Sequence, residues 1–217
     1  MRRHAGTLLI VLGTIFVAIA ISQFFEHQFK TKQALAKAKA IVETSPLKDT
    51  SAAERSASSA APPDSLAARP PFRPKENEVI GTLLIPKIKA ELPIIEGTDE
   101  EMLEQGVGHY RTSAFPTEGE QIVLSGHRDT VFRNFAKLDV GDRFIVKMPY
   151  GTYHYEISST EIVDKDDTSV IRSMGKEVLV VTTCYPFRYV GNAPERYIVY
   201  AVPVADDEND STDVTLR

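Results

Sequence analysis

Residues 178–204 read VLVVTTCYPFRYVGNAPERYIVYAVPV, two runs of β-branched and aromatic residues separated by a loop that contains two prolines and a glycine. Runs of this composition, bounded by Gly and Pro, are typical of β-strands. Two successive strands joined by a loop of 11 residues, 185–195, are expected to pair as antiparallel neighbours. This pairing would place Cys184, at the end of the first strand, beside Arg196, at the start of the second.

Cys184 is the only cysteine of the 217 residues, so it cannot form an intramolecular disulfide. A neighbouring cation favours the nucleophilic thiolate, but a free cysteine is also among the residues most often buried as plain packing. A cysteine nucleophile needs an acid/base partner within hydrogen-bond reach. Among the five histidines, His127 is the best candidate, because it follows Gly126 at the end of an apolar run. His109 could equally form a structural hydrogen bond.

The residues between 79 and 204 predict seven or eight short strands with little helix. A short helix is expected in 98–106, with Thr98 as its cap and Gly106 as its stop. Residues 140–163 predict a hairpin that turns at Tyr150 and Gly151. We therefore expect a mainly β fold, a closed or nearly closed seven- to eight-stranded β-barrel with short helices.

An apolar segment without charged residues, 5–25, precedes this domain and is long enough for one transmembrane helix. A cleaved signal peptide is the competing interpretation, because Arg2 and Arg3 precede an Ala-Ile-Ala sequence at 18–20. Residues 30–43 predict a short solvated helix, and the Ser-, Ala- and Pro-rich residues 44–74 predict a linker. The predicted organisation is an N-terminus and transmembrane anchor (1–29), a helical then Ser/Ala/Pro-rich linker (30–78), a compact domain (79–204) and an acidic disordered tail (205–217). Charge counting leaves the orientation of the anchor open, because Arg2 and Arg3 precede it and lysines from Lys30 onward follow it.

The net charge of −5 comes mostly from residues 206–217, which contain five acids and one arginine and so contribute −4. The remainder lacks the surplus of basic residues that binding to a phosphate backbone requires, so no nucleic acid partner is expected. Gly-rich phosphate loops, HExxH and C-x-x-C are all absent, and residues 164–167, DKDD, lack the remaining spacing of a calcium loop. We therefore expect no metal and no cofactor.

Three stretches together resemble the sortases, the membrane-anchored cysteine transpeptidases of Gram-positive bacteria. These are IGTLLIPKIKAELPIIEGTDEEML, GHYRTSAFPTEGEQIVLSGHRDTVFRNFAKLDVGD and VVTTCYPFRYVGNAPERYIVYA, which lie in this order between residues 79 and 204. The sequence Thr-Cys-Tyr-Pro-Phe is most similar to class D. The resemblance implies that Cys184 is the nucleophile, His127 the general acid/base and Arg196 the group that steadies substrate or oxyanion. Thr183 corresponds to the threonine of the family's T-L-x-T-C signature and would touch substrate, whereas Val180 and Val181 depart from that signature.

The resemblance also implies a function and a location. The enzyme would cleave an LPxT-like sorting motif of secreted proteins through a thioester, then transfer the protein to an amine of a peptidoglycan precursor. It would be a single-pass protein of the cell membrane, with a cytoplasmic N-terminus and an extracytoplasmic catalytic domain. Two alternatives stay open: a cysteine protease that uses water as acceptor, and a non-enzymatic tethered binding domain in which Cys184 is packing.

Overall fold

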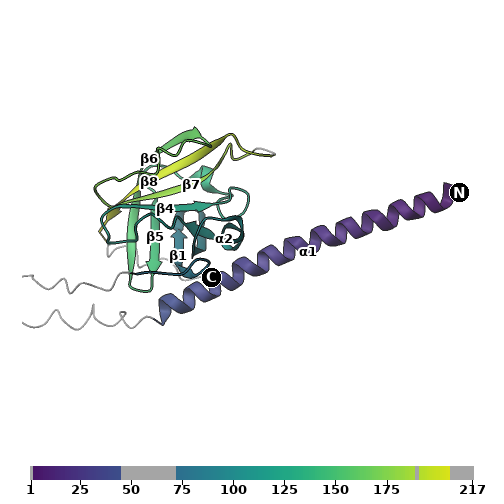
Figure 1. The fold of residues 1–217 in the computed structure, drawn as a ribbon, viewed down its shortest axis with the longest axis horizontal. Coiled ribbons are helices and arrows are strands. Elements are labelled where there is room, and N and C mark those ends of the chain that lie inside the picture. Colours follow the sequence, from purple (N-terminus) through teal and green to yellow (C-terminus); the bar gives the residue numbers. More distant parts are fainter. Residues whose placement is uncertain (1, 45–71, 189–190, 206–217) are drawn as a thin grey trace, which may run out of the picture.

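A computed structural model of the chain describes residues 2–44, 72–188 and 191–205, without the side chains of residues 2–10 and 23–28. Within this part, eight strands form one closed barrel beside a long N-terminal helix (Figure 1). The strands are β1 (Val79–Ile85), β2 (Ala90–Glu96), β3 (Val107–His109), β4 (Gln121–Gly126), β5 (Arg143–Met148), β6 (Gly151–Asp164), β7 (Val178–Tyr185) and β8 (Glu195–Val204). The helices are α1 (Arg2–Glu43), α2 (Glu100–Gln105), η2 (Pro86–Ile88) and η3 (Phe135–Lys137).

The barrel follows the strand order β1-β2-β3-β4-β7-β8-β6-β5 and closes where β5 pairs with β1. Two of its pairs are parallel, β2 with β3 and β4 with β7, and the other pairs are antiparallel. Closure leaves no free sheet edge in the ring. The predicted mainly β barrel is confirmed, with eight strands.

Side-chain alternation explains how the strands enclose the core. In β5 half-buried and fully buried positions alternate, and the fully buried residues Phe144, Val146 and Met148 point into the barrel. Strand β7 is buried on both faces: Leu179 and Val181 join the barrel core, while Val178 and Val180 join a second apolar cluster. A continuous apolar run is expected for a strand that is covered on both sides.

Two local predictions are confirmed, each with a correction of one residue. The hairpin between β5 and β6 is present, but Met148 pairs with Gly151, so the turn residues are Pro149 and Tyr150 rather than Tyr150 and Gly151. Helix α2, however, is capped by Asp99 and begins at Glu100, one residue later than a cap at Thr98 would give. The backbone explains the shift, because Asp99 has the extended φ and ψ that an N-cap residue adopts before the first helical residue.

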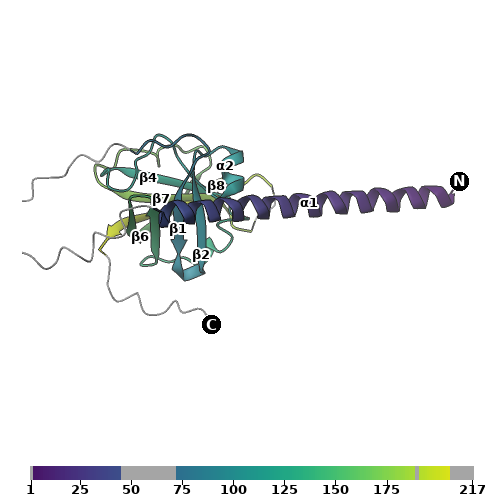
Figure 2. The ribbon, with the colours of Figure 1, turned by 90° about the horizontal axis from the view of Figure 1, so that it is seen from below.

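Helix α1 is continuous from Arg2 to Glu43, and its C-terminal part lies against the barrel while its N-terminal half extends away from it (Figures 1 and 2). Ala34 and Ala38 are buried against Val79, Ile95 and Met102. Lys30 forms an ion pair with Glu104 at 3.1 Å, and Lys39 forms one with Glu91 at 2.5 Å. Residues 30–43 are thus half solvated rather than fully solvated, because small alanine side chains allow this face to approach the barrel closely.

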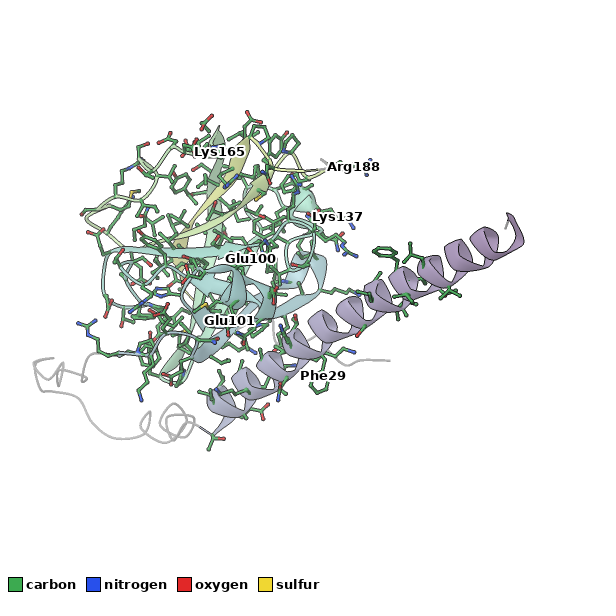
Figure 3. All side chains as sticks on the ribbon, turned by 45° about the vertical axis from the view of Figure 1, so that its right-hand side comes forward. Phe29, Glu100, Glu101, Lys137, Lys165 and Arg188 are labelled. Atoms are coloured by element: carbon green, nitrogen blue, oxygen red, sulfur yellow. The ribbon has the colours of Figure 1, made fainter. Side chains whose placement is uncertain are left out.

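Residues 11–22 of α1 carry exposed apolar side chains. In the described residues 11–22 they include Val17 and Phe16, which is 64% exposed, and Figure 3 shows Phe29 on the side of α1 away from the barrel. Over the residues whose side chains are described, no helix meets the length and hydropathy needed to cross a membrane. The side chains of residues 5–10 and 23–25, which belong to the predicted anchor, are not among those described.

The predicted linker lies mostly outside the described residues, as does the predicted acidic tail from residue 206 onward. The described chain resumes at Phe72, whose ring packs edge-on against Phe115 at 5.1 Å and against Tyr150 at 5.2 Å. The packed domain therefore includes at least one aromatic residue before the predicted start at residue 79.

We expect Ala38→Arg to lower the thermal stability of the full chain, because its side chain would have to enter the closed contact between α1 and the barrel. Overfilling a packed site costs about 1–3 kcal/mol. Ala36→Arg, at an exposed position of the same helix, is the matched control and should leave the melting temperature unchanged. Equal melting curves for the two variants would contradict the docking of α1.

Candidate active site

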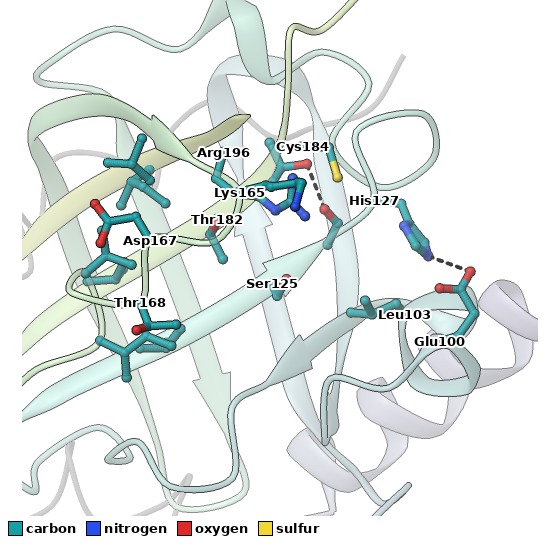
Figure 4. Close-up of a pocket in the computed structure, with 18 residues that line it drawn as sticks. Glu100, Leu103, Ser125, His127, Lys165, Asp167, Thr168, Thr182, Cys184 and Arg196 are labelled. Atoms are coloured by element: carbon teal, nitrogen blue, oxygen red, sulfur yellow. Dashed lines mark hydrogen bonds and ion pairs between the residues drawn. The ribbon is translucent and has the colours of Figure 1, made fainter. Parts of the chain in front are cut away.

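Strand pairing brings together three residues that are distant in sequence. Strand β7 pairs with β8 in the register Cys184 to Arg196, as predicted. On its other side β7 runs parallel to β4, with Gly126 opposite Thr183. The C-terminal ends of parallel neighbours lie at the same edge of a sheet, so His127, which follows Gly126, emerges next to Cys184. Figure 4 shows the thiol and the imidazole on the same side of the sheet.

Cys184, His127 and Arg196 line a groove with a volume of about 390 Å³. The outward-facing residues Val180 and Thr182 of β7 belong to its floor, and Leu103 of α2 lies on one side. A wall on another side comes from the segment that follows β6 and includes Lys165, Asp167, Thr168, Val170 and Ile171 (Figure 4). A second hollow of about 400 Å³ shares the three candidate residues and extends along Arg128, Asp129 and residues 191–193.

His127 is held at the end of β4 by a tight turn. Its carbonyl oxygen accepts a hydrogen bond from the Phe132 N–H at 3.1 Å. A Cβ on Gly126 would lie 2.5 Å from Cε2 of Phe132, so only glycine permits this approach. The imidazole Nε2 lies 3.4 Å from Oε1 of Glu100, whose side chain is 77% exposed. A pair this exposed contributes little to stability.

Arg196 reaches the groove from the start of β8. Its Nη1 donates hydrogen bonds to the carbonyl oxygens of Glu195 at 3.0 Å and Ala193 at 3.3 Å. A guanidinium has five N–H donors. Arg196 can therefore hold the end of the β7–β8 loop and still donate to an oxygen bound near Cys184.

This geometry agrees with the comparison with known proteins. Residues 83–204 match the sortase domain. The chain belongs to the sortase family. It is 59% identical over 130 residues to Sortase D of Bacillus subtilis (strain 168), a match that covers 59% of this chain and 66% of that protein. It is 26% identical over 128 residues to Sortase A of Bacillus anthracis, covering 57% and 59% respectively. The matches thus span less than two thirds of these curated relatives.

Solved sortase structures share the fold. A Clostridium perfringens Sortase D5 transpeptidase has a TM-score of 0.55 and 29% identity over 60% of this chain and 82% of that one. Sortase A from Corynebacterium diphtheriae has a TM-score of 0.56 and 33% identity over 62% and 65%. Sortase C of Clostridium perfringens, solved with the C-terminal cell wall sorting motif, has a TM-score of 0.55 and 29% identity over 60% and 73%.

In this sortase fold Thr183 lies next to Cys184 on β7 and is among the residues that line the groove, although its side chain is buried. It is 2% exposed, and its hydroxyl donates a 2.7 Å hydrogen bond to the Gly126 carbonyl oxygen. This bond ties the end of β7 to the residue before His127. A contact between Thr183 and substrate stays a prediction, since the hydroxyl is already used within the sortase domain.

Sequence reasoning missed Arg128, the residue after His127. Arg128 is only 7% exposed, and it donates from Nη1 to the Pro186 carbonyl at 2.8 Å and from Nη2 to the Gly191 carbonyl at 3.3 Å. It thereby fixes the loop after Cys184 relative to the residue that follows β4. The GHRD sequence contains no signal for this role, because arginine is mostly exposed in folded proteins.

His109, the other histidine that sequence considered, is a structural residue. It is 1% exposed, with Nδ1 2.7 Å from Oε2 of Glu96 and Nε2 3.0 Å from the Ala114 carbonyl. Its ring stacks on Phe115 at 4.3 Å. The structure thus separates it from the groove and leaves His127 as the histidine beside Cys184.

We expect Thr183→Val to destabilise the domain by about 1–3 kcal/mol, because it leaves the buried Gly126 carbonyl oxygen without its hydroxyl donor. Thr183→Ser keeps the donor and should lose less. Urea unfolding of the full chain measures the difference. If the serine variant were as unstable as the valine variant, the hydrogen bond would not be the source of the effect.

Proposed function

We propose that the chain is a class D-like cysteine transpeptidase that cleaves an LPxT-like sorting motif and transfers the protein to an amine of a cell-wall precursor. The observation that carries this proposal is the convergence of Cys184, His127 and Arg196 on one groove in a sortase domain. The sorting motif bound by Clostridium perfringens sortase C supports a peptide substrate of this kind. The groove offers Leu103, Val163 and Ile171 as apolar surface for the Leu-Pro part of such a motif.

In the first step the Cys184 thiolate attacks the carbonyl carbon of the motif's threonine. The carbonyl oxygen gains negative charge, and the Arg196 guanidinium donates to it. As the peptide C–N bond breaks, protonated His127 gives its proton to the leaving amine. The products are a thioester on Cys184 and the released C-terminal fragment.

In the second step the amine of the acceptor attacks the thioester carbon. His127, now neutral, takes a proton from the attacking nitrogen, and Cys184 leaves as a thiolate. The new amide bond replaces the one that was broken, so the thioester conserves its energy and no ATP is needed. Water in place of the amine would give hydrolysis by the same residues, which is the protease alternative.

We infer that the enzyme acts outside the cytoplasm, tethered by residues 5–25 with its N-terminus inside. The uncharged apolar sequence of this segment and the exposed apolar side chains of residues 11–22 support a lipid environment. A membrane-impermeant thiol reagent should therefore label Cys184, the single cysteine, in intact cells. Labelling that requires cell lysis would contradict the orientation.

The Cys184→Ala variant should form neither acyl adduct nor product with Leu-Pro-x-Thr peptides. The full chain is incubated with these peptides, with and without amine acceptors, and the products are identified by mass spectrometry. Adduct or product from the alanine variant would refute the nucleophile assignment. Cleavage by the wild type without amine-dependent ligation would favour the protease, and an unreactive thiol would favour a binding domain.

Arg196→Lys should lower kcat by about 10²–10³, the loss typical of removing one oxyanion donor. Lysine keeps the charge but cannot present several donors in a fixed plane. The melting temperature should change little, because the side chain is only partly buried. Wild-type turnover in this variant would exclude a role for the guanidinium in catalysis.

A further inference from the structure

The segment between β6 and β7, residues 165–177, forms a wall of the groove although it contains neither helix nor strand. A peptide bound in the groove would contact this wall, to which Lys165, Asp167 and Thr168 contribute polar groups (Figure 4). Because this segment belongs to no helix or sheet, its backbone N–H and C=O groups need hydrogen-bond partners elsewhere in the protein. Two adjacent residues supply them: Gln121, the first residue of β4, and Glu120, which precedes it.

The Glu120 carboxylate accepts hydrogen bonds from residues in the C-terminal half of the segment. Its Oε1 accepts from the Met174 N–H at 2.6 Å and the Gly175 N–H at 3.0 Å, and its Oε2 accepts from the Ser173 hydroxyl. The hydrogen bond from Ser173, followed by that from Met174, lowers the pKa of Glu120 below its usual value. Glu120 is therefore ionised at neutral pH, and these are charge-assisted hydrogen bonds, which are the stronger kind.

Gln121 forms hydrogen bonds with a part of the segment that lies nearer to the groove. Its side-chain amide is buried, with Nε2 donating to the Val170 carbonyl at 2.8 Å and Oε1 accepting from the Arg172 N–H at 3.1 Å. The amide thus replaces, for two backbone groups of the segment, the partners that a neighbouring strand would provide. Val170 itself lines the groove.

Apolar packing holds the underside of the same wall. Val170 is buried in the cluster of Val123, Val178, Val180, Ile198 and Tyr200, which covers the outer face of the sheet. Val123, Val180 and Ile198 also line the groove. The wall and the floor are therefore one packed unit, and the polar contacts from Glu120 and Gln121 fix its outer end.

We propose that Glu120 and Gln121 are positioning residues that hold residues 165–177 as a preformed wall for the peptide substrate. The proposal rests on the proposed function, because it assigns the wall to binding of the sorting peptide. This clamp, the hydrogen bonds of Glu120 and Gln121 to the wall, lies at the N-terminal end of β4, and His127 follows the C-terminal end of the same strand. One strand therefore positions both the wall and the proposed acid/base group. Because the wall is already ordered before the peptide binds, the free energy of binding is not reduced by the entropic cost of ordering the wall.

The test compares Glu120→Ala with Glu118→Ala in the full chain. Glu118 is an exposed carboxylate two residues earlier whose hydrogen bond, to the Phe115 N–H at 2.8 Å, does not involve the wall. A quenched fluorescent Leu-Pro-x-Thr peptide gives KM and kcat, iodoacetamide gives the reactivity of Cys184, and hydrogen–deuterium exchange reports the order of residues 165–177.

For Glu120→Ala we expect KM to rise roughly tenfold, with kcat changed less than about twofold. Exchange should be faster in residues 165–177, and the iodoacetamide rate should be unchanged. Gln121→Ala should act in the same direction. Glu120→Gln keeps an acceptor for Met174 and Gly175 and should recover part of the loss, whereas Glu118→Ala should match the wild type.

Unchanged exchange in Glu120→Ala would overturn the clamp, and faster exchange with an unchanged KM would overturn the role of the wall in binding. A parallel fall in kcat and in iodoacetamide reactivity would show a general distortion of the site and would also overturn the proposal. If the wild type does not turn over the peptide, the proposed function fails instead, and the exchange data still decide whether the clamp exists.

Discussion

Strand β7 has hydrogen-bonded neighbours on both sides, and this double pairing determines where each candidate catalytic group lies. The parallel pair with β4 sets Gly126 opposite Thr183, and the antiparallel pair with β8 sets Arg196 opposite Cys184. A slip of one residue in either pair would turn the affected side chains to the opposite face of the sheet. The candidate acid/base group, the candidate nucleophile and the cation are therefore placed by backbone register rather than by contacts among themselves.

Successive side chains of β7 point to opposite faces of the sheet. Thr182 and Cys184 line the groove, whereas Val181 belongs to the barrel core and the side chain of Thr183 is buried. The buried hydroxyl of Thr183 fixes the end of β4, and the buried Arg128 fixes the loop beyond Cys184. The candidate reactive groups thus stay partly exposed, because buried residues beside them and in the adjacent turn supply the rigidity that precise positioning requires.

The antiparallel pairing of Cys184 with Arg196 could be predicted because only a short loop separates the strands, so the chain has few alternatives. The parallel pairing of β4 with β7 could not, since it joins segments far apart and depends on how the whole barrel closes. The roles of Arg128 and Glu120 could not be predicted for the same reason, because their hydrogen-bond partners are backbone groups of distant loops. Arg196 could be placed beside Cys184 from the strand pattern, whereas Thr183 was recognised only through the family resemblance, and neither route gives the hydrogen bonds that these residues make.

Helix α2 connects the N-terminal helix to the groove. Met102 packs against α1, and Glu104 pairs with Lys30, while Glu100 and Leu103 of the same six residues line the groove. A helix this short is not stable alone and takes its position from its packing. Because α1 supplies part of that packing, the contact at Ala34 and Ala38 contributes to the shape of the groove at the side near His127, although none of the described side chains of α1 lines it.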